Sequence, residues 1–198
     1  MKKILTLVLA SALAGFAAAC ATSETTNTKP ATNTAPDATA SKTAARDDVP
    51  PSVHAVFPDA QSITKDHKDL TPGQISEIEK ETGSKLPDTD HHAYLAFSTS
   101  GGARKQIGAA SEVEVNGKQV VVVYESRSGL PYIKEVRAEG VAQAFLDQFK
   151  GKGHDDKFQI GKDLKAQGVD DATAKATASA IHVDIMTMET LYGAAHTH

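Results

Sequence analysis

The feature that most constrains the fold of this chain is a β-hairpin pattern over Ser111–Ser126. Val113 and Val115 alternate with glutamates, Asn116-Gly117 follows, and the run Val120–Val123 consists of four valines. Asn-Gly between two β-rich runs is typical of a type I′ turn, because both central residues need a positive φ angle. The valine run is apolar on both faces, which predicts a central strand covered on both sides. The first strand is apolar on one face only and is expected nearer an edge of the sheet.

Patterns on either side of the hairpin complete an α+β fold. A helix is predicted from Thr71-Pro72 to Gly83, because Thr caps free amides, Pro suits the first helical position and Gly suits the C-terminus. Strands are predicted over His92–Thr99 and Lys105–Ala110. Farther along, a loop is expected over Ser128–Tyr132, a helix over Glu139–Phe149 and a turn over Lys150–Gly153. A short extended piece over Phe158–Ile160 and a last helix over about Ala178–Leu191 are expected to follow. This order predicts an antiparallel sheet covered by helices.

The chain begins like an exported protein. Lys2 and Lys3 precede an uncharged run that ends at Ala19 and is short of the roughly 20 residues that a membrane-spanning helix needs. Residues 1–19 are therefore predicted to be a signal peptide. Cys20, the only cysteine, follows the small-residue cleavage site, and this arrangement resembles a lipoprotein signal whose cysteine is lipidated. Ala17 stands where such signals usually have Leu, which leaves cleavage by the ordinary signal peptidase open.

Residues 20–49 are predicted to be a lipid-attachment cysteine and a tether. The segment Ala21–Val49 contains 8 Thr and 7 Ala, and it has no aromatic residue. It cannot bury enough apolar surface to fold, so it is expected to be disordered. The predicted location is the periplasm, with a lipid anchor in the cell membrane or the outer membrane. Residues 50–198 remain as one domain.

Composition excludes several function classes. A net charge of −4 without a basic cluster argues against nucleic-acid binding. One cysteine excludes a disulfide framework, a cysteine-based zinc site and haem attachment. The adjacent His91 and His92 are expected to point to opposite faces of a strand, and His196 and His198 lie in a tail. The histidine spacing therefore predicts no metal site.

The segment Asp171–Ser179 is rich in small and polar residues and leads into the last predicted helix. Thr177 or Ser179 would then lie in the first turn of that helix. Free amides at a helix N-terminus suit a phosphate group. An ordinary helix cap is the alternative interpretation of the same residues.

Four segments resemble the FMN-binding domain family, whose members include the G subunit of the Rnf complex, the C subunit of the sodium-pumping NADH:quinone reductase and stand-alone lipoproteins. They are Phe57-Pro58-Asp59-Ala60, the helix from Leu70-Thr71-Pro72 to Leu86-Pro87, Pro131–Val136, and Phe145–Lys152 followed by Asp155-Asp156 and Ile160–Asp163. The last segment is the most specific of the four. Together they cover most of the domain.

The resemblance implies a flavin site. The family motif Asp-x-x-Ser/Thr-Gly-Ala-Thr, whose last Thr a flavin transferase esterifies to the FMN phosphate, falls on Asp171, Ala174, Lys175, Ala176 and Thr177, with Ser179 just after it. Thr177 is thus the implied attachment residue and Thr173 is a second choice. Tyr132 and Gly129 are expected beside the flavin ring, with the Val120–Val123 strand as the floor of the site. Lys175 replaces the motif glycine, and Ile133-Lys134 replaces an earlier Gly-Gly pair.

The resemblance therefore implies an envelope electron carrier rather than a stand-alone enzyme. Its cofactor is expected to be FMN and its partner a periplasmic or membrane redox protein, such as a c-type cytochrome or a reductase. Two alternatives stay open: a flavin-free member that acts as a binding or assembly lipoprotein, and a periplasmic metal-binding lipoprotein.

Overall fold

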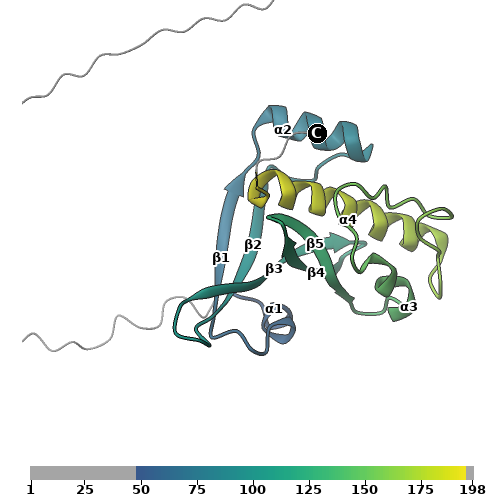
Figure 1. Ribbon diagram of the computed structural model, residues 1–198. Helices are drawn as coiled ribbons and strands as arrows, with labels where there is room; N and C mark the ends of the chain where they lie inside the picture. Colours follow the sequence, from purple (N-terminus) through teal and green to yellow (C-terminus); the bar gives the residue numbers. More distant parts are fainter. Residues whose placement is uncertain (1–47, 195–198) are drawn as a thin grey trace, which may run out of the picture. The chain divides into compact units, whose positions relative to one another are not determined.

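The computed structural model describes residues 48–194. Five strands form one sheet, four helices and a 3-10 turn surround it, and the chain order of these elements is helix, strand, helix, four strands, helix, turn and helix (Figure 1). The elements are α1 (Pro51–Val56), β1 (Ser62–Asp69), α2 (Pro72–Thr82), β2 (Asp90–Ser98), β3 (Lys105–Val115), β4 (Lys118–Arg127), β5 (Leu130–Ala138), α3 (Gln143–Leu146), η1 (Asp147–Phe149) and α4 (Asp171–Tyr192). The predicted α+β class is confirmed.

The sheet is an antiparallel meander in the order β1-β2-β3-β4-β5. The predicted hairpin joins β3 to β4, and Asn116 and Gly117 both have positive φ, 52° and 76°. The expectation that the first hairpin strand lies near an edge is wrong, because β3 is the middle strand. The predicted 128–132 loop is also shorter than expected: Ser128 and Gly129 form a second tight turn with positive φ, and β5 begins at Leu130.

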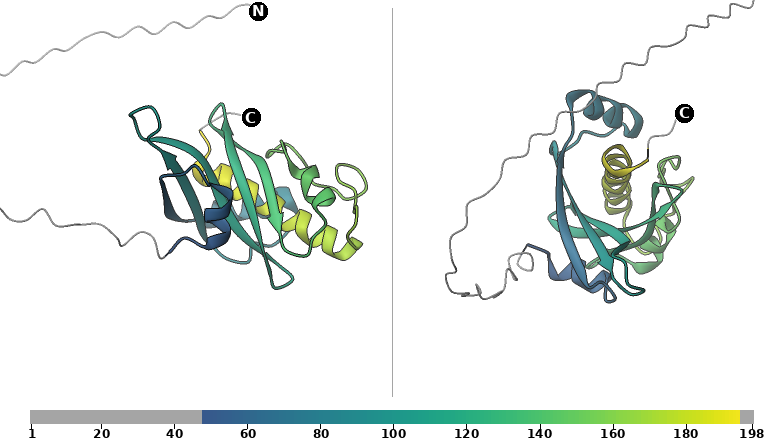
Figure 2. Two further views of the ribbon diagram at one scale, coloured as in Figure 1. Left: turned by 90° about the horizontal axis from the view of Figure 1, so that it is seen from below. Right: turned by 60° about the vertical axis from the view of Figure 1, so that its left-hand side comes forward.

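Both faces of the sheet are covered, as Figure 2 shows. On one face α4 packs Ile181 and Ile185 against Val122 and Ile133. On the other face α1 and the segment after it pack against residues of β2, β3 and β4, which include Tyr94, Ala110, Val121 and Val123. The predicted two-sided burial of the valine run is confirmed, since no residue of Val120–Val123 is more than 5% exposed.

Both predicted ends of the helix α2 are confirmed. The Thr71 side chain accepts the backbone N–H of Gln74, and the Gln74 side chain accepts the backbone N–H of Thr71, which is a capping box. Gly83 ends the helix with a φ angle of 69°. This left-handed conformation favours glycine.

Other boundaries differ from the prediction. The helix expected over 139–149 is reduced to α3 and η1, because Gly140 has a φ angle of 72° that a helix cannot include. The last helix begins at Asp171 and not near Ala178. The strands β1 and β5 and the helix α1 had no counterpart in the prediction. Cys20, the predicted signal peptide and His196 and His198 lie outside the described residues. Within residues 48–194 no helix has the length and apolarity to cross a membrane.

Candidate functional site

A groove of about 740 Å³ opens where the sheet divides. The pairing of β2 with β3 ends at Tyr94 and Ala110, yet β2 continues to Asp90 alongside β1 and β3 continues to Val115 alongside β4. The helix α4 and the loop between α2 and β2 form the other sides of the groove. Its apolar lining consists of Leu70, Leu86, Pro87, Val113, Ala176, Ala180 and Val183.

A buried carboxylate organises the polar side of the groove. Asp184 of α4 is 3% exposed, and its Oδ2 accepts the hydroxyls of Ser111 and Tyr124. Its Oδ1 lies 3.0 Å from Nε2 of His91. Burial, and then the charge of Asp184, hold the pKa of the Tyr124 hydroxyl well above its usual range. Three side chains from β2, β3 and β4 are thus tied to one residue of α4.

A serine pair links the two helices at the groove. Ser84, which follows α2, lies with its Oγ 2.7 Å from Oγ of Ser179 on α4. Ser179 and Ala176 both line the groove. These two are the residues of the implied flavin segment that the structure brings to the groove.

Thr177 lies elsewhere. It is in the second turn of α4, its side chain is 0% exposed, and its Oγ1 has no hydrogen-bond partner among residues 48–194. The expectation that Thr177 or Ser179 occupies the first turn is wrong, because Asp170 caps the helix seven positions before Thr177. Lys175 is exposed and lines no described cavity.

Acidic side chains occupy the N-terminus of α4. Asp170 accepts the backbone N–H and the hydroxyl of Thr173, and Asp171 lies in the first turn. The hydrogen bond from the Thr173 N–H holds the pKa of Asp170 below its usual range, so this residue is a carboxylate at neutral pH. Two negative charges at this end of α4 disfavour a phosphate there.

The residues expected beside the flavin ring do not reach the groove. Tyr132 lies on β5 beside Gly153, and the Arg127 guanidinium lies 4.8 Å from its ring centroid. Gly129 lines a second cavity of about 710 Å³ near the C-terminal end of α4. The Val120–Val123 strand belongs to the core and lines neither cavity.

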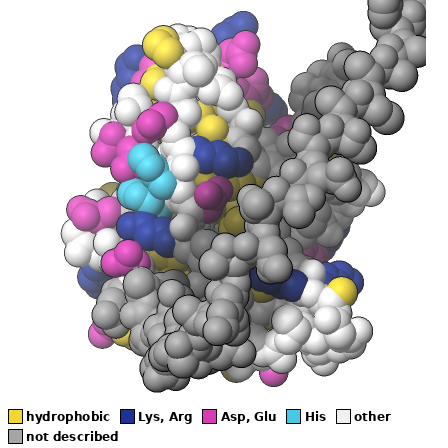
Figure 3. Space-filling model, turned by 90° about the vertical axis from the view of Figure 1, so that its left-hand side faces the viewer, with side chains coloured by type: hydrophobic (Ala, Val, Ile, Leu, Met, Phe, Trp, Pro, Cys, Tyr) yellow, Lys and Arg dark blue, Asp and Glu magenta, His cyan; other side chains and the backbone are white. Residues whose placement is uncertain are grey.

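Sequence reasoning missed a cluster on β1 and β2. His67 faces His92 across the two strands, and the carboxylate of Asp90 lies beside both rings, with one oxygen toward each. Figure 3 shows histidine side chains gathered beside acidic ones on this surface. His91 and His92 do point to opposite faces, since His91 reaches α4 whereas His92 stacks on His67. The unpredicted strand β1 supplies the second imidazole. The available signal was the pair of short patterns His67-x-Asp69 and Asp90-x-His92, which antiparallel pairing can bring together.

Comparisons of this chain with protein-family models, with curated proteins and with solved structures each find no match. The class of the protein is given by its fold and its groove: it is an α+β protein with a cleft of about 740 Å³ between a helix and a dividing sheet.

Proposed function

We propose that this protein is a cell-envelope electron-transfer protein that binds FMN in the groove without a covalent bond to Thr177. The observation that carries the proposal is that the segment resembling the flavin motif, through Ala176 and Ser179, forms a wall of the groove. The volume of about 740 Å³ is within the range of small-molecule sites. FMN, when bound, would supply one- and two-electron transfer.

The lining supports a planar, largely apolar ring more than it supports a phosphate. Ala180 and Val183 of α4 offer small and branched apolar surface opposite Leu86 and Val113. His91, held by Asp184, provides a hydrogen-bonded imidazole at the same wall. Lys85 is the only lysine or arginine among the lining residues, and its side chain is 88% exposed. A phosphate would therefore lie beside Lys85, close to solvent.

A covalent bond at Thr177 fits this structure poorly. The hydroxyl is fully buried, and a transferase would need the first two turns of α4 to open before it could reach it. Asp170 and Asp171 also oppose a phosphate at the start of the helix. The proposed binding is therefore reversible.

Titration of the protein with FMN, followed by flavin fluorescence and visible absorption, tests the proposal. Ala176→Phe places a ring in the groove and is expected to weaken FMN binding at least about tenfold, by overfilling a close-packed site. Ala172→Phe is the matched control, since Ala172 is exposed on the same helix and lines no described cavity. Equal affinity of the two variants would contradict binding in the groove.

Co-expression with a flavin transferase tests the mode of attachment. Protein that loses its yellow colour on denaturation, with an unmodified intact mass, supports reversible binding. A mass increase that Thr177→Val removes would instead show a covalent bond at that residue.

The second candidate is a flavin-free binding lipoprotein. The acidic lining favours it: Asp88, Asp90, Glu112, Glu114 and Asp184 outnumber the single Lys85 around the groove. Failure of the protein to bind FMN in the titration would select this function over the first. A partner that the parent chain captures and the Ala176→Phe variant does not capture would then identify the groove as its binding surface.

A further inference from the structure

We infer that His67, Asp90 and His92 form a binding site for one divalent transition-metal ion of the zinc and copper class. The site lies on the face of β1 and β2 opposite to α4, at the end where β2 stays paired with β1 beyond its own pairing with β3. Asp90 and His92 also line the groove, whereas His67 does not, so the site adjoins the groove and His67 is the ligand that belongs to the metal site alone.

Strand register places the ligands on one face. His67 lies opposite His92, and Asp69 lies opposite Asp90. Side chains two positions apart on a strand point to the same side, so the two histidines and the two aspartates share one surface. Side chains of directly opposed residues are close enough to contact each other.

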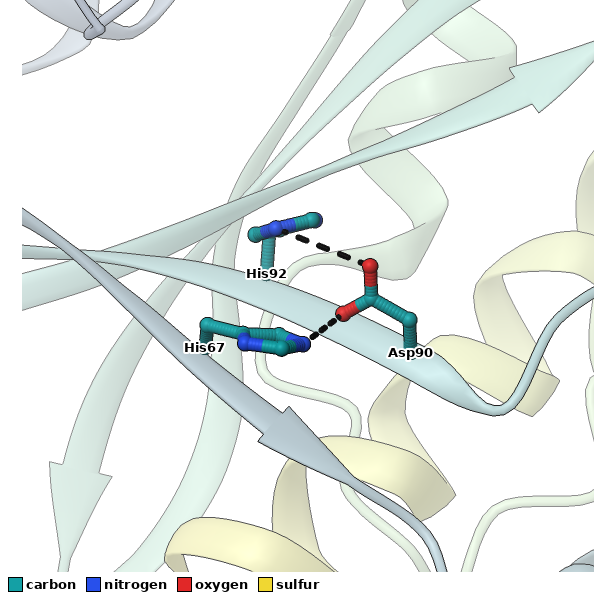
Figure 4. A group of neighbouring side chains, drawn as sticks. All are labelled: His67, Asp90 and His92. Atoms are coloured by element: carbon teal, nitrogen blue, oxygen red, sulfur yellow. Dashed lines mark ion pairs between the residues drawn. The ribbon is translucent and has the colours of Figure 1, made fainter.

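The three ligand groups converge without any ion. Nε2 of His67 lies 2.5 Å from Oδ1 of Asp90, and Nε2 of His92 lies 3.7 Å from Oδ2 of the same carboxylate (Figure 4). One ligand atom from each residue can be chosen so that all three lie within 4.8 Å of one another. Tetrahedral zinc with bonds of about 2.0–2.1 Å to nitrogen needs ligand atoms about 3.3 Å apart, which rotation of these side chains can supply.

The rings are already held together. The imidazoles of His67 and His92 stack with centroids 5.1 Å apart and planes at 24°. Asp69 lies with its Oδ1 3.6 Å from Nε2 of His67, so a second carboxylate is close to the same nitrogen. Side-chain exposures of 54% for His67, 39% for His92 and 37% for Asp90 leave room for an ion and for water.

The donor set selects the ion. Two imidazole nitrogens and a carboxylate suit Zn²⁺ and Cu²⁺, whereas Mg²⁺ and Ca²⁺ prefer oxygen ligands only. Three protein ligands leave a coordination position for water or for a ligand from solution, as in open zinc sites. By the usual order of divalent affinities, Cu²⁺ should bind more tightly than Zn²⁺.

Calorimetric titration of the full chain with Zn²⁺ near neutral pH tests this site. His196→Ala and His198→Ala are introduced first, so that any zinc bound is not bound by the imidazoles of the tail. We expect one zinc ion per chain and a Tm that rises with zinc concentration. Absence of saturable zinc binding by this tail-substituted chain would overturn the proposal.

Single substitutions then locate the ion. His67→Gln is expected to weaken zinc binding at least about a hundredfold, since even partners outside the ligand set contribute about 10–100-fold. His92→Gln provides a second test of the same prediction should His67→Gln fold poorly. His54→Gln, at an exposed histidine of α1, is the matched control and should bind zinc like the parent. Equal zinc affinity of the His67 and His54 variants would contradict the site.

Two further readouts separate metal binding at this site from FMN binding in the groove. Co²⁺ in place of zinc should give the visible absorption of tetrahedral cobalt in the parent chain and lose it in His67→Gln. FMN binding should be unchanged in His67→Gln, because that side chain is outside the groove. A cobalt spectrum that persists in His67→Gln would contradict the assignment of this ligand.

Discussion

The Oδ1 atom of Asp184 lies 3.0 Å from Nε2 of His91, and this contact ties the middle of α4 to β2. The other oxygen of Asp184 accepts the hydroxyls of Ser111 and Tyr124. A buried carboxylate with three partners holds the helix in one position on the sheet. The wall of the groove therefore depends on a polar network as well as on apolar packing.

Removing this carboxylate should destabilise the fold strongly. Asp184→Ala leaves two hydroxyls and an imidazole without their acceptor, and we expect the free energy of unfolding to fall by about 3 kcal/mol. Tyr124→Phe removes one donor and should cost about 1–2 kcal/mol. Urea unfolding measures both. Asp59→Ala, at an exposed aspartate, is the control, and equal urea midpoints for Asp184→Ala and Asp59→Ala would contradict the network.

Thr177 offers a test of its buried hydroxyl. Thr177→Val keeps the shape of the side chain and removes a polar atom that no described residue satisfies, so stability should stay constant or rise by about 1 kcal/mol. Thr177→Ala lacks both γ-methyl groups of the valine variant and should cost about 2 kcal/mol relative to Thr177→Val. A stability loss of about 1 kcal/mol or more in Thr177→Val relative to the parent would show that the hydroxyl has a partner.

Acid should weaken the fold through His182. Burial lowers the pKa of this imidazole below 6.5; Lys157 adds to the effect, while Glu81 and Asp156 oppose it. The unfolded chain therefore binds a proton near pH 6.5 that the folded chain does not bind. Stability is expected to be constant with respect to this group above that pH and to decrease as pH falls toward the lowered pKa.

The variant His182→Gln checks this sign. Urea unfolding at about pH 7.5 and about pH 5.5 should show a smaller loss of stability on acidification in His182→Gln than in the parent. His54→Gln is matched in chemistry but changes an exposed residue, and it should retain the parent's dependence. The same pH dependence in both variants would rule out His182 as a source of acid sensitivity.

Two glycines, one in crowded and one in open surroundings, provide a fourth test. A Cβ at Gly108 would lie 2.8 Å from the buried Phe57 ring and 3.3 Å from the Tyr124 carbonyl oxygen, so Gly108→Ala should cost about 1–3 kcal/mol. A Cβ at Gly73 in α2 meets nothing within 4 Å. Gly73→Ala should stabilise by up to about 1 kcal/mol through helix propensity. Thermal unfolding compares the two, and a Gly108→Ala variant as stable as Gly73→Ala would contradict the packing of Phe57.

Local chemistry made parts of the fold predictable. Asn116-Gly117 specifies its turn through its own φ angles, and Thr71 with Gly83 fixes both ends of α2. Two-sided burial of Val120–Val123 follows from the run of valines. The edge strand β1 was missed because Ile63 is its only buried residue, and such a strand has almost no hydrophobic pattern.

The start of α4 was placed too late for a related reason. The small and polar residues of Asp171–Ser179 suggested a segment that precedes a helix, yet its alternating alanines favour a helix and Asp170 caps it. This shift carries Thr177 from an expected exposed first turn into the core. The expected roles of Tyr132 and Gly129 also depended on a loop that is in fact the turn and first residues of β5.

The sequence by itself determined the turns, the caps and the strand that is buried on both faces, because each depends on residues within a few positions of one another. Only the tertiary structure decided the groove, the Asp184 network and the meeting of His67 with His92. These features depend on where strands pair and where their pairing stops, which is set by packing between residues far apart in the chain.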